Sequence, residues 1–154
     1  MVQSNRSNAT RRSHRVRSRN PGFVRMRMPS RREAVGPTVE RIIEAVEDAG
    51  LDDDQKLDLA VALAEALSNA AVHGNRLRAR SQVIVTVYVT PRVQATVEVK
   101  DSGRGFDASD LSDPTHDERI LAPSGRGVFL MRRLVDEVEF FPPGNRVRLK
   151  VEAR

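Results

Sequence analysis

The stretch from Glu65 to Asn75 carries three polar side chains whose types and spacing could do chemistry. Glu65, Asn69 and His73 follow one another at intervals of four residues, so on a helix they lie along one face. A carboxylate, an amide and an imidazole on a largely apolar helix are costly to bury unless a ligand, a metal ion or solvent meets them. The spacing therefore predicts that this polar face points into a pocket.

The remainder of the same helix is apolar, and its apolar side chains form two rows. Because a helix with so much apolar surface is usually buried, we expect both rows to lie against the core of the protein. One row consists of Leu57, Val61, Ala64, Leu67 and Ala71, and the second consists of Leu59, Leu63, Ala66 and Ala70.

A second group of residues directly follows a predicted strand and reads Asp101-x-Gly103-x-Gly105. Asp101 leaves the edge of the sheet, where its carboxylate can accept a hydrogen bond from the exocyclic amine of a ligand. The two glycines allow a tight turn and a close approach of a ligand to the backbone. Taken alone, the pattern is equally typical of an ordinary turn.

A third group, Ser124-Gly125-Arg126-Gly127-Val128, comes directly before a predicted helix. Glycines at a helix N-terminus expose free backbone N–H groups at the positive end of the helix dipole, which suits phosphate groups. The order of the three groups is more specific than any one of them, because the long segment 107–124 separates the second from the third.

Hydrophobic periodicity supplies the elements that must position these groups. Alternating residues predict five strands, and residues recurring at helical spacing predict three helices with Gly50 and Gly74 at helix ends. The strands have one polar face, so we expect an α/β (α+β) two-layer sandwich: a mostly antiparallel mixed sheet of about five strands with three helices on one face. The strands are predicted at 23–28, 82–90, 92–100, 137–141 and 146–152, and the helices at 31–49, 53–74 and 126–136.

Composition limits the possible functions. The 154 residues contain no cysteine and only three scattered histidines, which excludes disulfides and thiolate metal sites and argues against a zinc cluster. No apolar run approaches the roughly 18 residues that cross a bilayer, so we expect no membrane segment and a cytoplasmic location.

The charge of the chain is divided unevenly. Residues 1–32 contain ten arginines and no acidic residue, and the remainder holds 16 basic and 21 acidic residues, a net charge of −5. We interpret residues 1–21 as a disordered, arginine-rich tail and residues 22–154 as one domain. Such a tail is either a solvated leader or an arm for nucleic acid, a membrane surface or an acidic partner.

The three groups, in this order and spacing, resemble the Bergerat-fold ATPases, which include the catalytic domains of histidine kinases. Within this superfamily the chain is most similar to the small bacterial anti-sigma-factor serine/threonine kinases. The resemblance runs from about residue 23 to residue 151. It is carried by Glu65-x-x-x-Asn69-x-x-x-His73-Gly74, by Asp101-x-Gly103-x-Gly105-Phe106, and by Gly125-Arg126-Gly127-Val128 with the helix that follows.

The resemblance implies a role for each matching residue. Glu65 would be the general base toward a serine hydroxyl, and Asn69 would bind Mg²⁺ that bridges the triphosphate of ATP. Asp101 would recognise adenine. Residues 107–124 would form the ATP lid. The remaining nucleotide contacts would come from His73, Gly103, Gly105, Phe106, Ser124, Gly125, Arg126, Gly127 and Val128.

The family's activity then implies a function and partners. The chain would be an ATP- and Mg²⁺-dependent serine/threonine protein kinase that phosphorylates a small anti-sigma-factor antagonist. It would also sequester a sigma factor and form a homodimer. The alternative is a non-catalytic ATP-binding regulator that only sequesters its partner, although the retained Glu65 argues against it.

Other interpretations of the same residues stay open. Glu65 could pair with an arginine, Asn69 could be an ordinary hydrogen-bonding residue, and His73 could interact with the helix C-terminus instead of a ligand. A nucleic-acid-associated regulator would act through the arginine-rich tail, because the acidic domain has few aromatic residues for stacking. A histidine-kinase fragment is disfavoured, since no dimerisation helix with a phosphoacceptor histidine precedes the domain.

Overall fold

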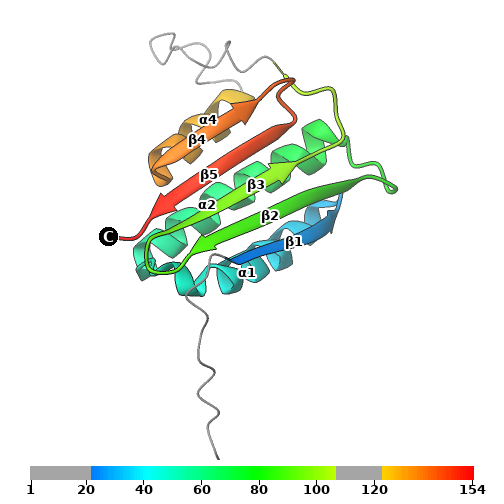
Figure 1. The fold of residues 1–154 in the computed structure, drawn as a ribbon. Helices are drawn as coiled ribbons and strands as arrows, with labels where there is room; N and C mark the ends of the chain where they lie inside the picture. The colour runs from blue at the N-terminus through cyan, green and yellow to red at the C-terminus, as the bar shows by residue number, and fades with distance from the viewer. Residues whose placement is uncertain (1–21, 107–122) are drawn as a thin grey trace, which may run out of the picture.

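The computed structural model describes residues 22–106 and 123–154 of the chain. It shows a five-stranded sheet with the strand order β1-β2-β3-β5-β4, in which every neighbouring pair is antiparallel. Helices α1, α2 and α4 all lie behind the sheet in the view of Figure 1, so the expected two-layer sandwich is confirmed. The strands are β1 Gly22–Pro29, β2 Gln82–Thr90, β3 Gln94–Lys100, β4 Glu137–Phe141 and β5 Arg146–Glu152, and the helices are α1 Val35–Ala45, α2 Asp53–Asn69 and α4 Pro123–Leu134.

Two sequence predictions lie outside this description. The arginine-rich tail, 1–21, and all but the last two residues of the expected lid, 107–124, fall on residues that the structure does not describe. The division of the chain into a tail and a domain therefore stays a prediction. Among the described residues, no helix has both the length and the apolar character needed to cross a membrane.

The core lies between the sheet and the helices. Alternate side chains of the central strands face the helices because successive residues of a strand point to opposite sides of the sheet. Val85, Val97 and Leu149 are fully buried there, and Leu63 and Leu67 of α2 pack into the same cluster. This core fixes α2 across the sheet, and so fixes the position of the polar face that α2 carries.

The N-terminus of α2 is anchored by hydrogen bonds between two side chains and the backbone. Asp52 is the N-cap residue, and its Oδ1 accepts a hydrogen bond of 2.7 Å from the Gln55 backbone N–H. The Gln55 Oε1 accepts in return from the Asp52 N–H at 3.2 Å, which completes a capping box. The Gln55 Nε2 also donates to the Glu152 carbonyl at 2.6 Å, and this bond ties the helix to β5.

The region predicted as one helix at 31–49 is divided into three parts. A 3₁₀ turn at Arg32–Ala34 leads into α1, and a second 3₁₀ turn at Glu47–Ala49 follows it. Gly50 ends the region as predicted, with a left-handed φ of 83°, and a Cβ there would lie 2.9 Å from the Arg92 Cα.

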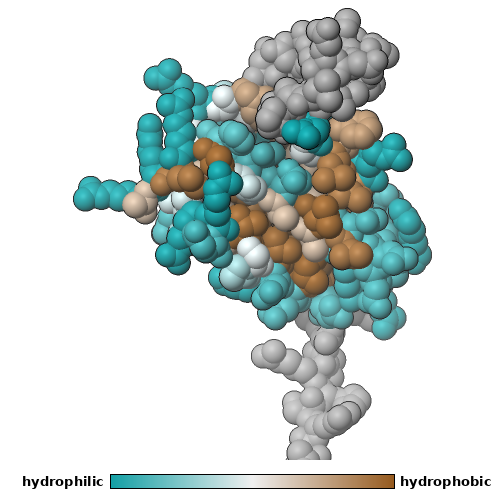
Figure 2. Space-filling model, turned by 180° about the vertical axis from the view of Figure 1, so that it is seen from behind, coloured by the Kyte–Doolittle hydropathy of each residue, from teal (hydrophilic) through white to brown (hydrophobic). Residues whose placement is uncertain are grey.

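The prediction that both apolar rows of α2 are buried is wrong for the N-terminal part of the first row, although Leu67 and Ala71 at its other end are buried. Leu57 is 64% exposed and Val61 is 39% exposed, whereas Leu59, Leu63 and Ala66 of the second row are buried. A helix in a two-layer fold buries only the side that faces the sheet and the flanks that meet its neighbours, so its outer stripe meets solvent. Figure 2, which shows the helix side of the molecule, has hydrophobic residues gathered over the middle of this face.

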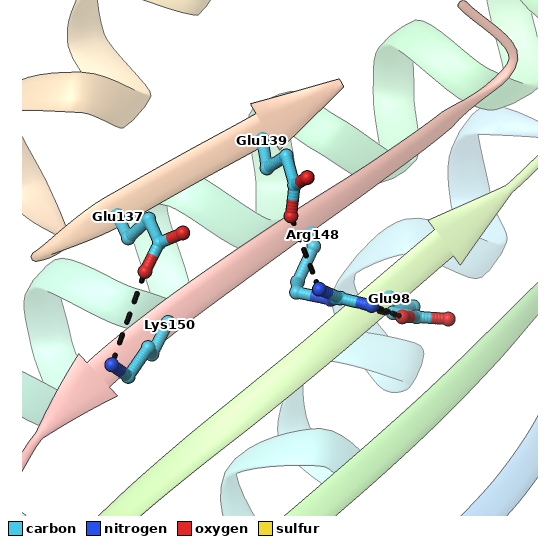
Figure 3. Close-up of polar contacts among 5 residues, drawn as sticks. All are labelled: Glu98, Glu137, Glu139, Arg148 and Lys150. Atoms are coloured by element: carbon cyan, nitrogen blue, oxygen red, sulfur yellow. Dashed lines mark hydrogen bonds and ion pairs between the residues drawn. The ribbon is translucent and has the colours of Figure 1, made fainter. Parts of the chain in front are cut away.

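The open face of the sheet carries charged side chains that neutralise one another. Arg148 of β5 pairs with Glu98 at 2.7 Å and with Glu139 at 3.1 Å (Figure 3). Lys150 pairs with Glu152 at 2.7 Å and lies 3.9 Å from Glu137. These pairs link β3, β5 and β4 across the strands, as opposite charges do when they face each other in a sheet.

Candidate nucleotide-binding site

A cavity of about 830 Å³ opens between the C-terminal end of α2, the loop after β3, helix α4 and the turn between β4 and β5. Three of the four segments carry one of the residue groups that the sequence singled out. Its walls include Asn69, His73, Asp101, Gly103 and Val128. Its size is typical of sites for small-molecule ligands.

The sequence predicted a regular helix that continues to Gly74, but the structure shows a different end of α2. The α-helix ends at Asn69, and Ala70–Gly74 form a single π-helical turn. The Asn75 N–H donates to the Ala70 carbonyl at 2.8 Å, five residues back. Such turns recur at functional sites, and this one starts directly after a cavity-lining amide. Helical spacing alone could not predict it.

Asn69 and His73 both line the cavity, the first half-buried and the second exposed. Within the part of the chain that the structure describes, neither side chain makes a hydrogen bond or an ion pair. The amide of Asn69 therefore has its full bonding capacity available for a ligand. The prediction that the polar face of this helix points into a pocket fits this placement for these two residues.

Glu65 is half-buried and lies beside the cavity instead of in its wall. Its carboxylate faces the start of α4, because a Cβ added to Gly127 would lie 2.8 Å from the Glu65 Oε2 and 3.3 Å from the Asn69 Nδ2. Any side chain at Gly127 would therefore press on both polar groups. The first and the third residue groups thus meet at this glycine.

Asp101 is half-buried at the end of β3, and burial raises the pKa of its carboxyl group, while the hydrogen bond from the Gly103 N–H lowers it. That N–H donates to the Asp101 Oδ1 at 2.7 Å. Gly74 packs directly on the carboxylate, because a Cβ there would overlap it, and a Cβ on Gly103 would collide with the Gly74 carbonyl. The first and second groups are therefore in contact as well.

The segment after Asp101 turns at Gly105, which has a φ of 76°. A Cβ at Gly105 would overlap the backbone of Pro143, so this glycine lets the loop pass close to the turn between β4 and β5. Phe106 follows and packs edge-on against Phe140, with ring centroids 5.2 Å apart. Both Gly105 and Phe106 line the cavity, where the sequence predicted nucleotide contacts.

Helix α4 starts earlier than predicted. It begins at Pro123, so Ser124 and Gly125 lie within its first turn instead of preceding it. Proline is favoured at the first position of a helix because its missing N–H needs no partner there, a signal that the prediction did not use. Arg126 is exposed and Val128 is 5% exposed, with Val128 in the cavity wall.

Sequence reasoning missed several residues of this site. The cavity is also lined by residues that the sequence analysis did not single out: Asn75, Arg76, Arg78, Met131, Phe140 and Asn145. Asn145 is the last residue of the turn between β4 and β5, and its carbonyl accepts from the Asp101 N–H at 3.0 Å. In the sequence, Asn145 is only a polar residue next to a turn glycine, and this pattern does not predict the contact.

The donor set of the site limits the kind of metal ion that it could hold. Among the described residues, no group of three or more histidine, cysteine, aspartate or glutamate side chains could ligate a metal ion. An all-protein zinc or calcium cage is therefore not formed by these residues. A single amide oxygen next to phosphate groups does fit Mg²⁺, which keeps several water ligands and often takes others from the phosphates of a nucleotide.

Comparisons with known proteins agree with this geometry. The family described as the histidine kinase-like ATPase domain matches residues 28–151. The serine-protein kinase RsbW of Bacillus subtilis (strain 168) is 30% identical over 125 residues, which cover 77% of this chain and 78% of that protein. The serine-protein kinase RsbW of Staphylococcus aureus (strain MRSA252) is 27% identical over 125 residues, covering 77% of this chain and 79% of its own length.

A solved structure supports the fold alone. The crystal structure of the RsbU and RsbW domains of a Mycobacterium tuberculosis protein superposes with a TM-score of 0.57 at 15% sequence identity. The match covers 86% of this chain and 32% of the longer Mycobacterium chain.

Proposed function

Because the chain belongs to the histidine kinase-like ATPase domain family, and within it to the anti-sigma-factor serine kinases, we propose that it is an ATP-dependent serine/threonine protein kinase. The observation that carries the proposal is the meeting of three separate residue groups around one cavity. Gly127 lies against Glu65 and Asn69, and Gly74 lies against Asp101. The Asn69 amide and the Asp101 carboxylate line one ligand-sized cavity and the Glu65 carboxylate lies beside it, and we assign them the roles of metal ligand, adenine acceptor and proton acceptor.

Different sides of the cavity would bind different parts of ATP. The Asp101 carboxylate would accept a hydrogen bond from the adenine amine, and Gly103 and Gly105 would let the base approach the backbone. The N–H groups of Ser124 and Gly125, which are left free in the first turn of α4, would bind phosphate oxygens. Gly127 would let the phosphates approach the helix closely, and Arg126 would be a further cation. His73, Phe106 and Val128 would complete the contact with the nucleotide.

The phosphoryl transfer would depend on charge neutralisation and on one proton acceptor. Mg²⁺, when bound through Asn69 and the phosphates, supplies positive charge that offsets the charge developing on the transferred group. Glu65 would accept the proton of the attacking serine hydroxyl. Its position beside Gly127, at the start of α4, places a carboxylate next to the helix end that would hold the phosphates.

The partners follow from the family. We propose that the chain phosphorylates a small anti-sigma-factor antagonist, sequesters a sigma factor and works as a cytoplasmic homodimer. The alternative is a non-catalytic ATP-binding module that only sequesters its partner. One observation favours this alternative, since Glu65 lies beside the cavity and not in its wall.

One experiment separates the two functions. The full chain, Glu65→Ala and the control Glu40→Ala, which changes an exposed glutamate of α1, are incubated with labelled ATP, Mg²⁺ and the candidate antagonist. We expect Glu65→Ala to keep its ATP affinity by calorimetry and to lose phosphotransfer by about 10²- to 10⁴-fold, the range for removal of a general base. Undiminished transfer by Glu65→Ala would refute the role of Glu65, and no transfer by the unsubstituted chain would favour the sequestering module.

A further inference from the structure

We propose that Asn75 is a positioning residue that makes the site select adenine over guanine nucleotides, by fixing the loop that carries Asp101. The inference rests on the proposed function, because it concerns how the same cavity recognises the base. Asn75 is 3% exposed, and among the residues that the structure describes only Ser30, Thr38 and Gln55 are polar and similarly buried. A buried amide is costly unless its hydrogen bonds are made, and those bonds show what Asn75 holds.

Asn75 joins three segments that are distant in sequence. Its Oδ1 accepts a hydrogen bond of 2.7 Å from the Ser102 N–H, in the residue directly after Asp101. Its Nδ2 donates to the Ser30 Oγ at 2.7 Å, and the Ser30 hydroxyl donates in turn to the Ser81 carbonyl at 2.9 Å. The orientation of the amide is fixed by chemistry, because the Ser102 N–H can only donate and therefore must meet the oxygen.

The π-helical turn brings Asn75 to this place. The turn starts directly after Asn69 and ends at Gly74, and the Asn75 N–H closes it on the Ala70 carbonyl at 2.8 Å. The same few residues therefore carry the proposed metal ligand, the glycine that packs on Asp101 and the amide that holds the next loop. A regular α-helix would turn Asn75 to a different direction, because each residue advances the helix by about 100°.

The contact with Ser102 bears directly on the Asp101 side chain. With the Ser102 N–H held by Asn75 and the Gly103 N–H donating to the Asp101 Oδ1 at 2.7 Å, the turn is braced on both sides of Ser102. Asn145 adds two longer bonds of 3.3 Å from its Nδ2 to the carbonyls of Asp101 and Gly103. The bond from Asn75 is shorter and comes from a buried side chain, so it is the firmer support.

A carboxylate held in one position discriminates between purine bases. It can accept a hydrogen bond from the amine of adenine, but it faces another acceptor when guanine presents its carbonyl oxygen. Sites that use a fixed polar group reject the mismatched ligand strongly, because the buried group is then left without a partner. Loosening the turn lets the carboxylate move away from the mismatch, and the preference for ATP then falls.

The test compares affinities for ATP and GTP by calorimetry, using the full chain with Mg²⁺. We expect Asn75→Ala to lower the ratio of ATP to GTP affinity by about tenfold, the equivalent of one good hydrogen bond. Ser30→Ala is the matched control, because it removes the other partner of Asn75 and leaves the Ser102 contact in place. We expect Ser30→Ala to lower the unfolding temperature without changing the ratio.

A double-substitution cycle makes the test specific to Asp101. Asn75→Ala should change the ATP to GTP ratio in the unsubstituted chain and leave it unchanged in Asp101→Asn, because the two residues act through one carboxylate. Equal weakening of both nucleotides by Asn75→Ala, or independent effects of the two substitutions, would overturn the inference. If the unsubstituted chain bound neither nucleotide, the proposed function would fail and this inference with it.

A measurement without any substitution covers the case in which Asn75→Ala does not fold. The Ser102 amide is held by Asn75 in the structure, and it should exchange its hydrogen more slowly than the amide of Arg104 in the same loop. Equal exchange rates in the unsubstituted chain would show that the contact is not maintained, and would overturn the inference as well.

Discussion

The open face of the sheet and the cavity at its edge are both polar, but they use their polar groups differently. On the open face, Arg148 is neutralised by Glu98 and Glu139 within the protein itself (Figure 3). At the cavity, Asn69 and His73 have no hydrogen-bond or ion-pair partner among the described residues. Polar groups that satisfy one another stabilise the fold, whereas polar groups left with unused capacity around a cavity are available to a ligand.

The two regions also perturb pKa values for opposite reasons. The hydrogen bond to Glu98 is the largest cause that raises the pKa of Arg148, so a partner stabilises its charged form. Loss of solvent is the largest cause that raises the pKa of Asp101, so its charged form is destabilised. A destabilised carboxylate gains from any ligand that donates a hydrogen bond to it, and this property distinguishes the cavity from the sheet face.

The largest effect on nucleotide affinity that we predict comes from filling the space beside Asp101. Gly74→Ala places a methyl group on the carboxylate, so the turn must shift, and we expect ATP affinity to fall by at least about tenfold with a loss of about 1–3 kcal/mol of unfolding free energy. Gly36→Ala in α1 is the matched control, since a Cβ there meets nothing within 4 Å. It should stabilise the helix by about 0.5–1 kcal/mol and leave affinity unchanged.

Calorimetry and thermal unfolding of both variants measure this pair of effects. If Gly74→Ala bound ATP as tightly as Gly36→Ala, the cavity next to Asp101 would not be where the base binds. The close packing of Gly74 on Asp101, compared with the open surroundings of Gly36, would then be unrelated to nucleotide binding.

A smaller effect is expected from removing the side-chain amide of Asn69, which has no hydrogen-bond partner among the described residues. Asn69→Ala should reduce ATP affinity by about tenfold in the presence of Mg²⁺ and much less in its absence, because only the metal contact is removed. No described residue bonds to this side chain, so the unfolding temperature should not fall. Titrations of ATP with and without Mg²⁺ check both expectations, and an equal loss in the two conditions would refute the metal role.

Much of the fold and part of the site could be predicted from residue patterns, because alternation and helical spacing depend only on neighbouring residues. The sequence predicts β4 and β5 with the bounds that the structure has, and it predicts the polar face on which Asn69 and His73 lie. It also predicts that Asp101 ends a strand next to a glycine turn. Each of these features depends on neighbours within a few residues, which a pattern can show.

Features that depend on distant contacts could not be predicted in the same way. The exposure of Leu57 and Val61 is decided by which flank of α2 its neighbours cover, and the pattern of α2 is apolar on more than one side. The bonds that Asn75 makes to Ser30 and Ser102 span 45 and 27 residues, so no local pattern contains them. Most of the missed site residues, such as Arg76, Arg78 and Asn145, lie on loops and turns that the fold brings to the cavity.

The raised pKa of Asp101 predicts how the stability of the protein depends on pH. Because burial raises the pKa of Asp101 above its ordinary value of 3.8, the folded state holds a proton that the unfolded state has already released. The carboxylate therefore lowers stability as pH rises through the window just above 3.8, and Asp101→Asn should be relatively more stable above that window. Its Oδ1 can still accept from the Gly103 N–H.

The nucleotide affinity should respond in the opposite direction. Protonation removes the charge of the acceptor and so weakens its hydrogen bond with the adenine amine, and the ATP affinity of the unsubstituted chain should therefore fall as pH drops through the raised pKa of Asp101. Dividing by the affinity of Asp101→Asn at each pH cancels the titration of ATP itself. Parallel pH profiles for the two proteins would show that Asp101 does not recognise the base.

The smallest effect is expected on the open face of the sheet. Arg148→Gln removes the cation shared by Glu98 and Glu139, and because the arginine side chain is 37% exposed we expect a loss of only about 0–1 kcal/mol of unfolding free energy. Added salt should shrink the difference from the unsubstituted chain, since screening already weakens an exposed pair. ATP affinity and phosphotransfer should not change. Circular dichroism checks that Arg148→Gln keeps its fold. If the folded variant lost nucleotide binding, the charges of the open sheet face would influence the cavity. The distinction between polar groups that satisfy one another and polar groups available to a ligand would then not hold for this protein.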